Sequence, residues 1–476
     1  MTRESVELRT ELTRKAVHIG TGAFALALRW LAPIEAALAT AGALVFNLLL
    51  LHRLTGRALL REHERPSGFS RGVALYPVAV LALVLVFSRR LELAAAVWGL
   101  LAVGDGMAAV VGRLAGGPRL AWNPAKRWSG LVAFVLYGTA AAAFLLRWTQ
   151  RGVLDGASDG SSAIGASFLA ASVADAWLPD PAFLLLGCFA AALAAAFAES
   201  LDVRVDDNLL VPLVGAGVLW VATWIEPGRV AASAADWSRA LVPAIVVNGV
   251  LAAAAYFAGG VGRSGVLGGP VLGTALYAFA GIEGFVLLLT FFVLGTAATR
   301  VGFARKRQLG IAEERGGRRG AANAFANTTT GVVCAFLAGA TGRPLLALAA
   351  LTGAFATAAF DTVSSEIGKA YGRRTLLITS FRRVAPGTEG AVSLEGTLAG
   401  LAAAALVAGV AWGTGRIPLV AVGLVVVGAF VGATVESYLG ALASTGRPLD
   451  NHLMNFTNTV IGAATAAVLV AAVGLG

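Results

Sequence analysis

Residues 417–435 read IPLVAVGLVVVGAFVGATV and contain no charged side chain. A helix of about 20 apolar residues is long enough to cross the roughly 30 Å hydrocarbon core of a bilayer. Five further uncharged stretches approach this length: Pro181–Ala198, Leu209–Ile225, Leu241–Gly262, Gly396–Gly415 and Phe456–Gly476. The core of a soluble protein needs no such runs, so the sequence predicts a polytopic integral membrane protein.

Weaker apolar blocks bring the expected number of membrane spans to about fourteen. The stretches do not alternate apolar and polar residues as a membrane β-barrel would, and a helix satisfies its own backbone hydrogen bonds in lipid. The predicted fold is therefore all-α, a polytopic transmembrane helical bundle in two related halves. The weaker blocks are Thr21–Leu31, Ala36–Leu51, Val73–Phe87, Leu93–Val111, Leu131–Leu146, Gly284–Thr299, Thr328–Ala340 and Leu345–Ala359.

Composition excludes an ordinary soluble protein. Hydrophobic residues make up 57% of the chain, charged residues 13%, and the mean hydropathy is +0.77, whereas soluble domains average about 45–50% apolar and about 25% charged residues. Cys188 and Cys334 lie inside apolar stretches and indicate neither a disulfide framework nor a metal site. The charged N-terminus, MTRESVELRTELTRK, predicts no removable signal peptide.

The net charge of +10 is carried by Arg and Lys residues that collect in loops between the apolar stretches. This distribution follows the positive-inside tendency, so the expected partner is the lipid bilayer and not a nucleic acid. The densest basic segments are Arg300–Arg319 and Lys369–Arg383. We expect these loops to face the cytoplasm, in a chain inserted in the cytoplasmic (inner) membrane.

Three elements recur in the same order in the two halves of the chain. They are an Asp with a Gly-basic pair seven positions later (Asp105 with Gly112-Arg113, Asp361 with Gly368-Lys369), a Glu-Ser pair (Glu199-Ser200, Glu436-Ser437) and an Asp-Asn-x-Leu segment (Asp207–Leu210, Asp450–Leu453). This order favours the duplication of one scaffold. The polar stretch Glu226–Ala240 is the predicted boundary between a first domain, residues 1–230, and a second, residues 240–476.

Asp105 interrupts the apolar block VWGLLAVGDGMAAVVG. An ionisable residue in a membrane span is costly and by default marks a functional site, so Asp105 is predicted to be catalytic. The alternative is an N-cap between two short helices, because Asp caps helices well and the glycines on either side permit a break.

Basic residues and glycine before a span predict an anion site, because free backbone N–H groups and the helix dipole add to the side-chain charge. Lys126-Arg127-Trp128-Ser129-Gly130 has this composition, and Arg113 begins the same loop. Lys126 is predicted to be catalytic, and Arg113, Arg127 and Gly130 to bind phosphate. Phosphate binding is also predicted for Arg14, Lys15 and His18, which open the first span, although a basic membrane flank would have the same composition.

Carboxylates cluster between two apolar spans of a protein whose other loops are basic. They are Glu199, Asp202, Asp206 and Asp207. Clustered carboxylates repel one another unless a cation bridges them, and Mg²⁺ binds one or two carboxylates together with substrate phosphates. We therefore predict that Glu199, Asp206, Asp207 and the adjacent Asn208 bind Mg²⁺ or another divalent cation; a solvated outer loop is the alternative.

Carboxylates for Mg²⁺ and basic helix starts for phosphate are the parts that phosphoryl transfer needs, since that chemistry depends mainly on positioning and charge neutralisation. The sequence contains no Walker A motif and no HRD and DFG pair of a protein kinase. Any kinase in this chain is therefore of a membrane type.

The N-terminal half resembles the dolichol and phytol kinase family, which is related to membrane CTP-dependent cytidylyltransferases. Four motifs carry the resemblance: RKAVH (14–18), GDGMAAVVGR (104–113), NPAKRWSG (123–130) and ESLDVRVDDNLLVP (199–212). The family commonly reads Lys-Ser-Trp-Glu-Gly where this chain has Lys126–Gly130, so Ser129 replaces an acidic residue. The resemblance implies phosphorylation of an isoprenoid alcohol such as phytol.

The C-terminal half resembles the integral-membrane family that includes the plant phytyl-phosphate kinases. The matching segments are SGVLGG (264–269), TRVGFARK (299–306), FDTVSSEIG (360–368), APGTEGAVSLEGTLAG (385–400), VESYLGA (435–441) and DNHLMNF (450–456). Relatives usually carry Asp-Ser where this chain has Glu436-Ser437. The resemblance implies conversion of the monophosphate to the diphosphate.

The second half carries its own predicted site residues. Asp361 and Glu366 are predicted to be catalytic, with a capped helix start as the alternative, and Glu436 to bind the metal. Pro386–Gly390 resembles a turn whose N–H groups cradle phosphate, and the residues predicted to bind phosphate are Lys369, Gly387, Thr388, Gly390 and Asn451. Asparagines spaced three or four apart predict polar helix faces that line a cavity or join helices: Asn323 and Asn327, and Asn451, Asn455 and Asn458.

Together the two resemblances imply a bifunctional membrane kinase for prenyl-chain salvage. Its substrates would be an isoprenoid alcohol and its monophosphate, with CTP or ATP as the nucleoside triphosphate donor and a divalent cation as cofactor. Joining the two activities would raise the effective concentration of the lipid intermediate. Two other functions are consistent with the sequence: a CTP-dependent lipid cytidylyltransferase, and a lipid or small-molecule transporter, since paired halves are common in carriers.

Overall fold

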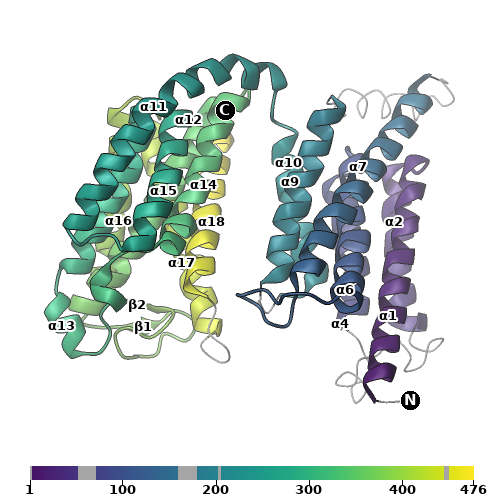
Figure 1. Cartoon of the computed structure of the whole chain (residues 1–476), viewed down its shortest axis with the longest axis horizontal. Coiled ribbons are helices and arrows are strands. Elements are labelled where there is room, and N and C mark those ends of the chain that lie inside the picture. Colours follow the sequence, from purple (N-terminus) through teal and green to yellow (C-terminus); the bar gives the residue numbers. More distant parts are fainter. Residues whose placement is uncertain (1–2, 52–70, 159–179, 202–204, 444–449, 476) are drawn as a thin grey trace. The chain divides into compact units, whose positions relative to one another are not determined.

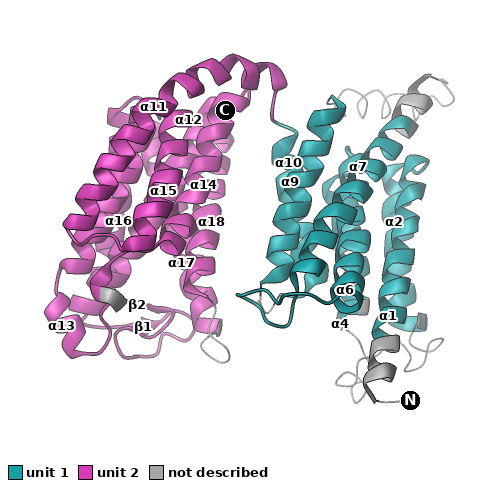
Figure 2. Cartoon of the chain, viewed as in Figure 1, with its two compact units in different colours: residues 1–224 teal, residues 225–476 magenta. Residues whose placement is uncertain are grey.

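The computed structural model describes residues 3–51, 71–158, 180–201, 205–443 and 450–475 (Figure 1). Eleven helices in these residues are long and apolar enough to cross a membrane. The strands found there, β1 (Leu376–Leu377) and β2 (Ala391–Val392), form one antiparallel pair. The predicted all-α membrane fold is confirmed. The chain forms two compact units, residues 1–224 and 225–476 (Figure 2).

Unit 1 is built from apolar helices joined by short helical segments. In chain order its described elements are α1 (Arg3–Thr21), η1 (Gly22–Arg29), α2 (Pro33–Phe46), η2 (Asn47–Leu51), α4 (Arg71–Val86), α5 (Leu91–Gly99), η3 (Leu100–Gly104), α6 (Asp105–Leu114), α7 (Trp128–Ser158), α9 (Pro181–Ser200) and α10 (Asp207–Ala222).

Unit 2 contains longer helices and the β1–β2 pair. In chain order its elements are α11 (Pro227–Phe257), α12 (Arg263–Arg300), α13 (Phe303–Gln308), η4 (Glu314–Gly317), α14 (Ala321–Ala340), α15 (Pro344–Tyr371), β1, β2, α16 (Leu394–Gly413), α17 (Leu419–Ala443) and α18 (Asn451–Ala472). Helix α12 is broken at Gly281, whose φ of 71° is outside the helical range.

One helix of each unit is largely enclosed by its neighbours. In Leu91–Leu114, which runs through α5, η3 and α6, 72% of the most apolar window is buried, and in α15 the value is 78%. Both helices are rich in alanine, and small side chains let other helices approach closely inside a membrane. These two central helices carry Asp105 and Asp361, so each unit holds one predicted catalytic aspartate in its interior.

The spans differ from the prediction in number and in one position. Among the described residues, eleven helices meet the length and hydropathy expected of a span, whereas about fourteen spans were predicted for the whole chain. The block Thr21–Leu31 folds mainly as the short η1, and the blocks Val73–Phe87 and Leu209–Ile225 fold as the shorter apolar helices α4 and α10. The first part of α12 was not among the predicted spans, because Arg263, Pro270 and several glycines weaken its apolar signal.

The polar stretch Glu226–Ala240 is not a linker in the structure. Residues 227–240 form the first turns of α11, and the two units divide just before it, between Trp224 and Ile225. Pro227 at the first helical position starts the helix, because its fixed φ suits that position and its missing N–H is not needed there.

A close helix crossing recurs in both units. A Cβ added at Gly130 of α7 would lie 2.8 Å from the Ala108 carbonyl oxygen and 3.5 Å from the Gly112 Cα. A Cβ added at Gly396 of α16 would lie 2.5 Å from the Ser364 carbonyl oxygen and 3.2 Å from the Gly368 Cα. Ala108 and Ser364 stand three positions after Asp105 and Asp361, and the two contacted glycines stand seven positions after them. The matching contacts favour a duplicated scaffold.

The helix caps correct the register of this repeat by one residue. The carboxylate of Asp206 accepts from the Asn208 N–H at 3.0 Å and begins α10. The carboxylate of Asp450 accepts from the His452 N–H at 2.8 Å and begins α18. Asp450 therefore corresponds to Asp206 and not to Asp207, and Asn451 corresponds to Asp207.

Candidate functional site

Asp105 lies within a continuous helix and is not an N-cap. Its backbone N–H bonds the Leu100 carbonyl five residues back, in the π-helical segment η3, and no side-chain capping bond is formed at this junction. This shift frees the Leu101 carbonyl, which lies 2.9 Å from His18 Nε2. A carbonyl oxygen can only accept, so Nε2 carries the proton. Single π turns inside α-helices often mark functional positions.

The Asp105 carboxylate binds two groups from α1. Lys15 Nζ lies 2.7 Å from Oδ2, and His18 Nε2 lies 3.3 Å from the same oxygen. Asp105 is 4% exposed and Lys15 9% exposed, so this ion pair is almost fully buried. Arg14 takes another direction and pairs with Glu11 at 2.5 Å. The structure therefore brings Lys15 and His18, but not Arg14, to the predicted catalytic aspartate.

The environment of His18 favours its neutral form. Burial lowers the pKa of the imidazole, the Asp105 carboxylate raises it and Lys15 lowers it, and the result is a pKa below the usual 6.5. At pH 7 His18 is therefore mostly neutral.

Three carboxylates from separate motifs meet in unit 1. Single oxygens of Asp105, Glu199 and Asp207 all lie within 4.8 Å of one another. They come from α6, from the end of α9 and from the start of α10. Oxygen atoms at this spacing are suitable ligands for a hard divalent cation.

Lys126 lies against this carboxylate cluster, defined as Asp105, Glu199 and Asp207. Its Nζ is 2.7 Å from Glu199 Oε1 and 3.5 Å from Asp207 Oδ2, and it also donates to the Glu199 carbonyl. Burial lowers the pKa of the ammonium, but the two carboxylates raise it further, so the pKa lies above 10.5. Lys126 is therefore a permanent cation beside the cluster.

Asp206 and Asn208 do not join the cluster. Asp206 caps α10, and its Oδ1 also accepts from Asn208 Nδ2 at 2.8 Å. Asp206 accepts from both the backbone and the side-chain amide of Asn208, whereas Asn208 Oδ1 is buried and has no hydrogen-bond partner among the described residues. Asp202 lies outside the described residues.

The loop before α7 is fixed to the end of α9 by residues that were not predicted as site residues. Asn123 Nδ2 donates to the Ser200 carbonyl at 3.0 Å, and Trp122 Nε1 donates to Ser200 Oγ at 3.0 Å. Asn123 Oδ1 also accepts from the Ala125 N–H at 3.1 Å. These bonds place Lys126 beside Glu199. Asn123 is the first residue of the motif NPAKRWSG, so the sequence could have singled it out. Nothing in the motif indicated that Asn123 binds Ser200.

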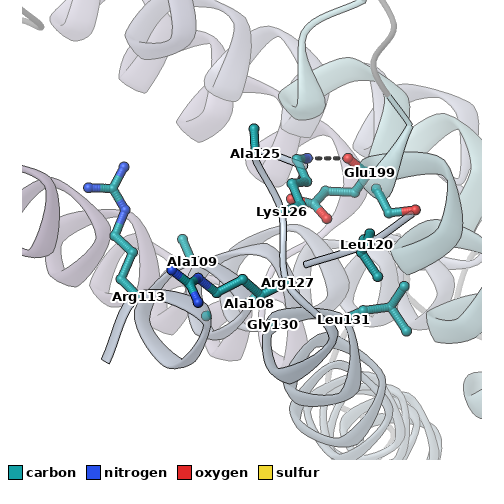
Figure 3. A pocket seen from close by; sticks show the side chains of 12 residues that line it. Ala108, Ala109, Arg113, Leu120, Ala125, Lys126, Arg127, Gly130, Leu131 and Glu199 are labelled. Carbon is teal, nitrogen blue, oxygen red and sulfur yellow. Dashed lines mark hydrogen bonds and ion pairs between the residues drawn. The ribbon is translucent and has the colours of Figure 1, made fainter. Parts of the chain in front are cut away.

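A cavity of about 200 Å³ opens beside Lys126 and Glu199 (Figure 3). Arg113, Arg127, Gly112 and Gly130 also line it. In Figure 3 the Lys126–Glu199 ion pair and Arg113 lie on different sides of the view. Three basic side chains and the N-terminal turn of α7 give this cavity the character of an anion site.

Other contacts in the loop hold its shape. Arg127 Nη1 donates to the Gly117 carbonyl at 2.8 Å, and Ser129 Oγ donates to the Gly116 carbonyl at 2.5 Å. Ser129 therefore stabilises the loop and is not among the residues that line the cavity. Gly130 allows the close crossing of α6 and α7 described above.

In unit 2 the predicted residues Asp361 and Glu436 are also brought together. Their carboxyl groups lie within hydrogen-bonding reach of one another, one from α15 and one from α17. Asn458 Nδ2 donates to Glu436 Oε2, and with the Asn455 amide turned so that both of its polar atoms have partners, its nitrogen lies 3.3 Å from Glu436 Oε1. The Asn455 oxygen accepts from Asn327 at 3.2 Å. Of the predicted asparagine faces, Asn455 and Asn458 therefore contact Glu436, and Asn327 contacts Asn455.

Glu366 faces a different set of groups. It pairs with Lys306, which is 0% exposed and also donates to the Thr299 carbonyl at 2.9 Å. Lys369 Nζ lies 3.5 Å from Glu366 and 3.4 Å from Glu313. Sequence reasoning assigned Lys306 to a basic loop and missed its burial, because its neighbours Arg305 and Arg307 are exposed.

The predicted phosphate turn of unit 2 is held mainly by its own contacts. Gly387 and Gly390 have φ of 87° and 73°, which favour glycine. The Thr388 N–H and hydroxyl both bond the Ala385 carbonyl, at 3.2 and 2.7 Å, so they are not free to cradle an anion. Asn451 is exposed in the first turn of α18 and lies outside the group around Glu436.

Comparison with known proteins adds relatives to this geometry. Residues 246–463 match the family described as integral membrane protein DUF92. The chain is 40% identical over 199 residues to the uncharacterized membrane protein sll0875 of Synechocystis sp., a match that covers 41% of this chain and 77% of the relative. No solved structure matches the chain.

Two plant relatives match a similar fraction of this chain. Protein VTE6 of Arabidopsis thaliana is 40% identical over 215 residues, 44% of this chain and 64% of that protein. A probable phytol kinase 2 of Oryza sativa subsp. japonica is 29% identical over 216 residues, 43% of this chain and 63% of that protein. The chain thus spans less than two thirds of the length of these two relatives. Its match to more than three quarters of sll0875, together with the family match, shows that the chain belongs to the DUF92 family of integral membrane proteins.

Proposed function

We propose that the protein is a bifunctional membrane kinase for isoprenoid alcohols. Unit 1 phosphorylates phytol or a similar alcohol, and unit 2 phosphorylates the resulting monophosphate to the diphosphate. The observation that carries the proposal is the carboxylate cluster of unit 1, which adjoins a cavity lined by Lys126, Arg113 and Arg127. A relative named as a probable phytol kinase supports the same reaction class.

A divalent cation, Mg²⁺ in the first instance, suits the donor set of unit 1. Asp105, Glu199 and Asp207 would hold it through hard carboxylate oxygens that already lie within 4.8 Å of one another. When bound, the cation would neutralise charge on the phosphate oxygens. Two lysines, Lys15 and Lys126, offset part of the negative charge of the cluster and keep the three carboxylates together.

The residues of the cavity have the remaining roles. Arg113, Arg127 and Lys126 would bind the triphosphate of the donor, for which we propose CTP, with ATP as the other candidate. The alcohol oxygen then bonds the γ-phosphorus, the bond to the β,γ-bridging oxygen breaks, the nucleoside diphosphate leaves with that electron pair, and the hydroxyl proton is released. Loose transition states of this kind are stabilised mainly by positioning and charge. We place these loops on the cytoplasmic side of the inner membrane.

The division of labour is tested with the purified full-length chain and γ-labelled CTP or ATP. Asp105→Asn is expected to abolish monophosphate formation from phytol or geranylgeraniol while leaving phosphorylation of added monophosphate intact. Asp361→Asn is expected to do the reverse. Asp236→Asn, which changes an exposed carboxylate paired with Arg239, is the control and should leave both activities unchanged.

Three outcomes contradict the proposal. Loss of the same activity in both variants, with thermal unfolding unchanged, would refute the assignment of one step to each unit. Retention of label from the cytosine base in the lipid product would identify a cytidylyltransferase instead. Movement of lipid across vesicles without nucleotide turnover would identify a transporter.

A further inference from the structure

The carboxyl pair of unit 2 lies in helices that cross the apolar interior. Asp361 belongs to α15 and Glu436 to α17, both of which are long and apolar enough to span a membrane. Glu436 is 8% exposed, and the two carboxyl groups are in contact. Two carboxylates this close in a medium of low polarity repel each other unless a proton or a cation lies between them.

The basic residues nearby bind other groups, although Lys369 and Arg319, which donates to Asn323, lie close enough for their charges to act on Asp361. Lys306 pairs with Glu366 and with backbone carbonyls, and Lys369 lies between Glu366 and Glu313. Across the described ranges of the chain, no Lys, Arg or His comes within ion-pair distance of Asp361 or Glu436. The pair therefore lacks a direct cationic partner in the part of the chain that the structure describes.

Asn458 supplies an independent indication of a ligand. The residue is 1% exposed, and its Nδ2 donates to Glu436 Oε2. Its Oδ1 is fully buried and has no hydrogen-bond donor among the described residues. A buried acceptor without a partner costs free energy, and this oxygen belongs to the same amide group whose nitrogen donates to Glu436. A bound cation would satisfy it.

We propose that unit 2 binds a divalent cation through Asp361, Glu436 and the Oδ1 atom of Asn458. Three oxygen ligands select a hard ion, Mg²⁺ or Mn²⁺. Asp361 and Glu436 occupy the repeat positions of Asp105 and Glu199, whereas the third ligand, Asn458, lies further along α18 than Asn451, the residue at the repeat position of Asp207. The proposed function of unit 2 explains what the cation would be used for, but the binding of the cation does not depend on that function. It can be measured without turnover.

The test measures Mn²⁺ binding to the purified full-length chain in detergent, by electron paramagnetic resonance of free Mn²⁺ after removal of bound metal. We expect two Mn²⁺ per chain, of which Asp105→Asn removes one. In that background, Asp361→Asn or Glu436→Gln is expected to abolish binding of the second ion. Asn458→Leu is expected to weaken the affinity for that ion about tenfold or more. Glu436→Asp and Asn458→Asp keep an oxygen ligand and should retain it.

Opposite results overturn the proposal. A single Mn²⁺ per wild-type chain that Asp105→Asn abolishes would show that Asp361 and Glu436 share a proton and bind no metal. Weakening by Asn458→Asp as large as that by Asn458→Leu would exclude Asn458 as a ligand. Because these readouts are stoichiometry and affinity, two bound ions without kinase activity would refute the proposed function alone.

Discussion

At the scale of single residues, the candidate site of unit 1 is an arrangement of opposite charges. Asp105, Glu199 and Asp207 stay together because Lys15 pairs with Asp105 and Lys126 pairs with both Glu199 and Asp207. Burying one partner of such a pair without the other costs about 3–5 kcal/mol. The charged residues of this site therefore act as a set, and changing one of them alters the state of the others.

His18 predicts how stability depends on pH in the same region. Its pKa in the folded chain lies below 6.5, so the unfolded chain binds the proton more readily. Stability from the neutral imidazole is present above about pH 6.5 and is lost as the pH falls toward the lowered pKa. We expect the thermal midpoint to fall between pH 7 and 5.5, and to fall less in His18→Gln, whose amide still donates to the Leu101 carbonyl. An equal fall in both chains would show that other groups set this dependence.

The sequence predicted both the carboxylates of the unit 1 cluster and the basic residues beside them, Lys15, His18 and Lys126, as site residues, but not that they pair with one another. Asp105, Glu199 and Asp207 are acidic residues beside apolar spans, and that cost makes them visible. Lys306 was hidden because Arg305, Lys306 and Arg307 are consecutive cations in a loop, and only the fold buries the middle one. Asp206 was taken for a ligand because capping and metal binding use the same residue type.

At the scale of helices, the glycine crossings determine which side chains can meet. Gly130 and Gly396 place α7 and α16 against backbone atoms of the central helix of their own unit, three and seven positions after the aspartate. The sequence drew attention to Gly130 as a phosphate-binding residue but gave no reason to expect a helix crossing at Gly130 or Gly396 among 59 glycines. Contact distance across two helices is a property of the folded chain, so this part of the fold could not be predicted.

Helix α16 provides a matched test of the crossing. In Gly396→Ala the new methyl group would meet the Ser364 carbonyl and the Gly368 Cα, neither of which can rotate away. We expect a loss of about 1–3 kcal/mol, seen as a lower thermal midpoint in detergent. Gly409→Ala in the same helix has no atom within 4 Å of the added carbon, so its midpoint should stay the same or rise. Equal midpoints for the two variants would contradict the close crossing.

At the scale of the whole molecule, apolar runs and charge were sufficient to predict a helical membrane protein, because lipid permits few backbone solutions. The number of spans was predicted less well. Broken helices such as α12 and short apolar ones such as α4 and α10 depend on packing within each unit. The assignment of one reaction to each unit stays a prediction.

The orientation of unit 2 is open to a direct test. The segment 301–320 carries the densest positive charge and precedes α14, whereas Gly342 follows the far end of α14. Arg307→Cys should react with a membrane-impermeant maleimide from the cytoplasmic side, and Gly342→Cys from the opposite side, because both native positions are exposed. The native Cys188 and Cys334 are buried and should react slowly. Labelling from the reverse sides would contradict the cytoplasmic placement of this loop.

The π turn before Asp105 also bears on how the two halves diverged. One extra residue in a helix rotates everything beyond it by about 100°, so a single-codon insertion can turn one end of a helix while the other end keeps its neighbours. The residues that contact the crossing glycines stand at the same distances after Asp105 and after Asp361. Helix α15, in contrast, has no π turn before its aspartate and is an α-helix throughout. If the extra residue arose after duplication, removing one residue from Leu100–Gly104 would return the Leu101 carbonyl to the helix ladder and take away one of the two oxygens that face His18 Nε2. An ancestral form lacking the insertion would therefore have held a histidine at this place through the Asp105 carboxylate alone.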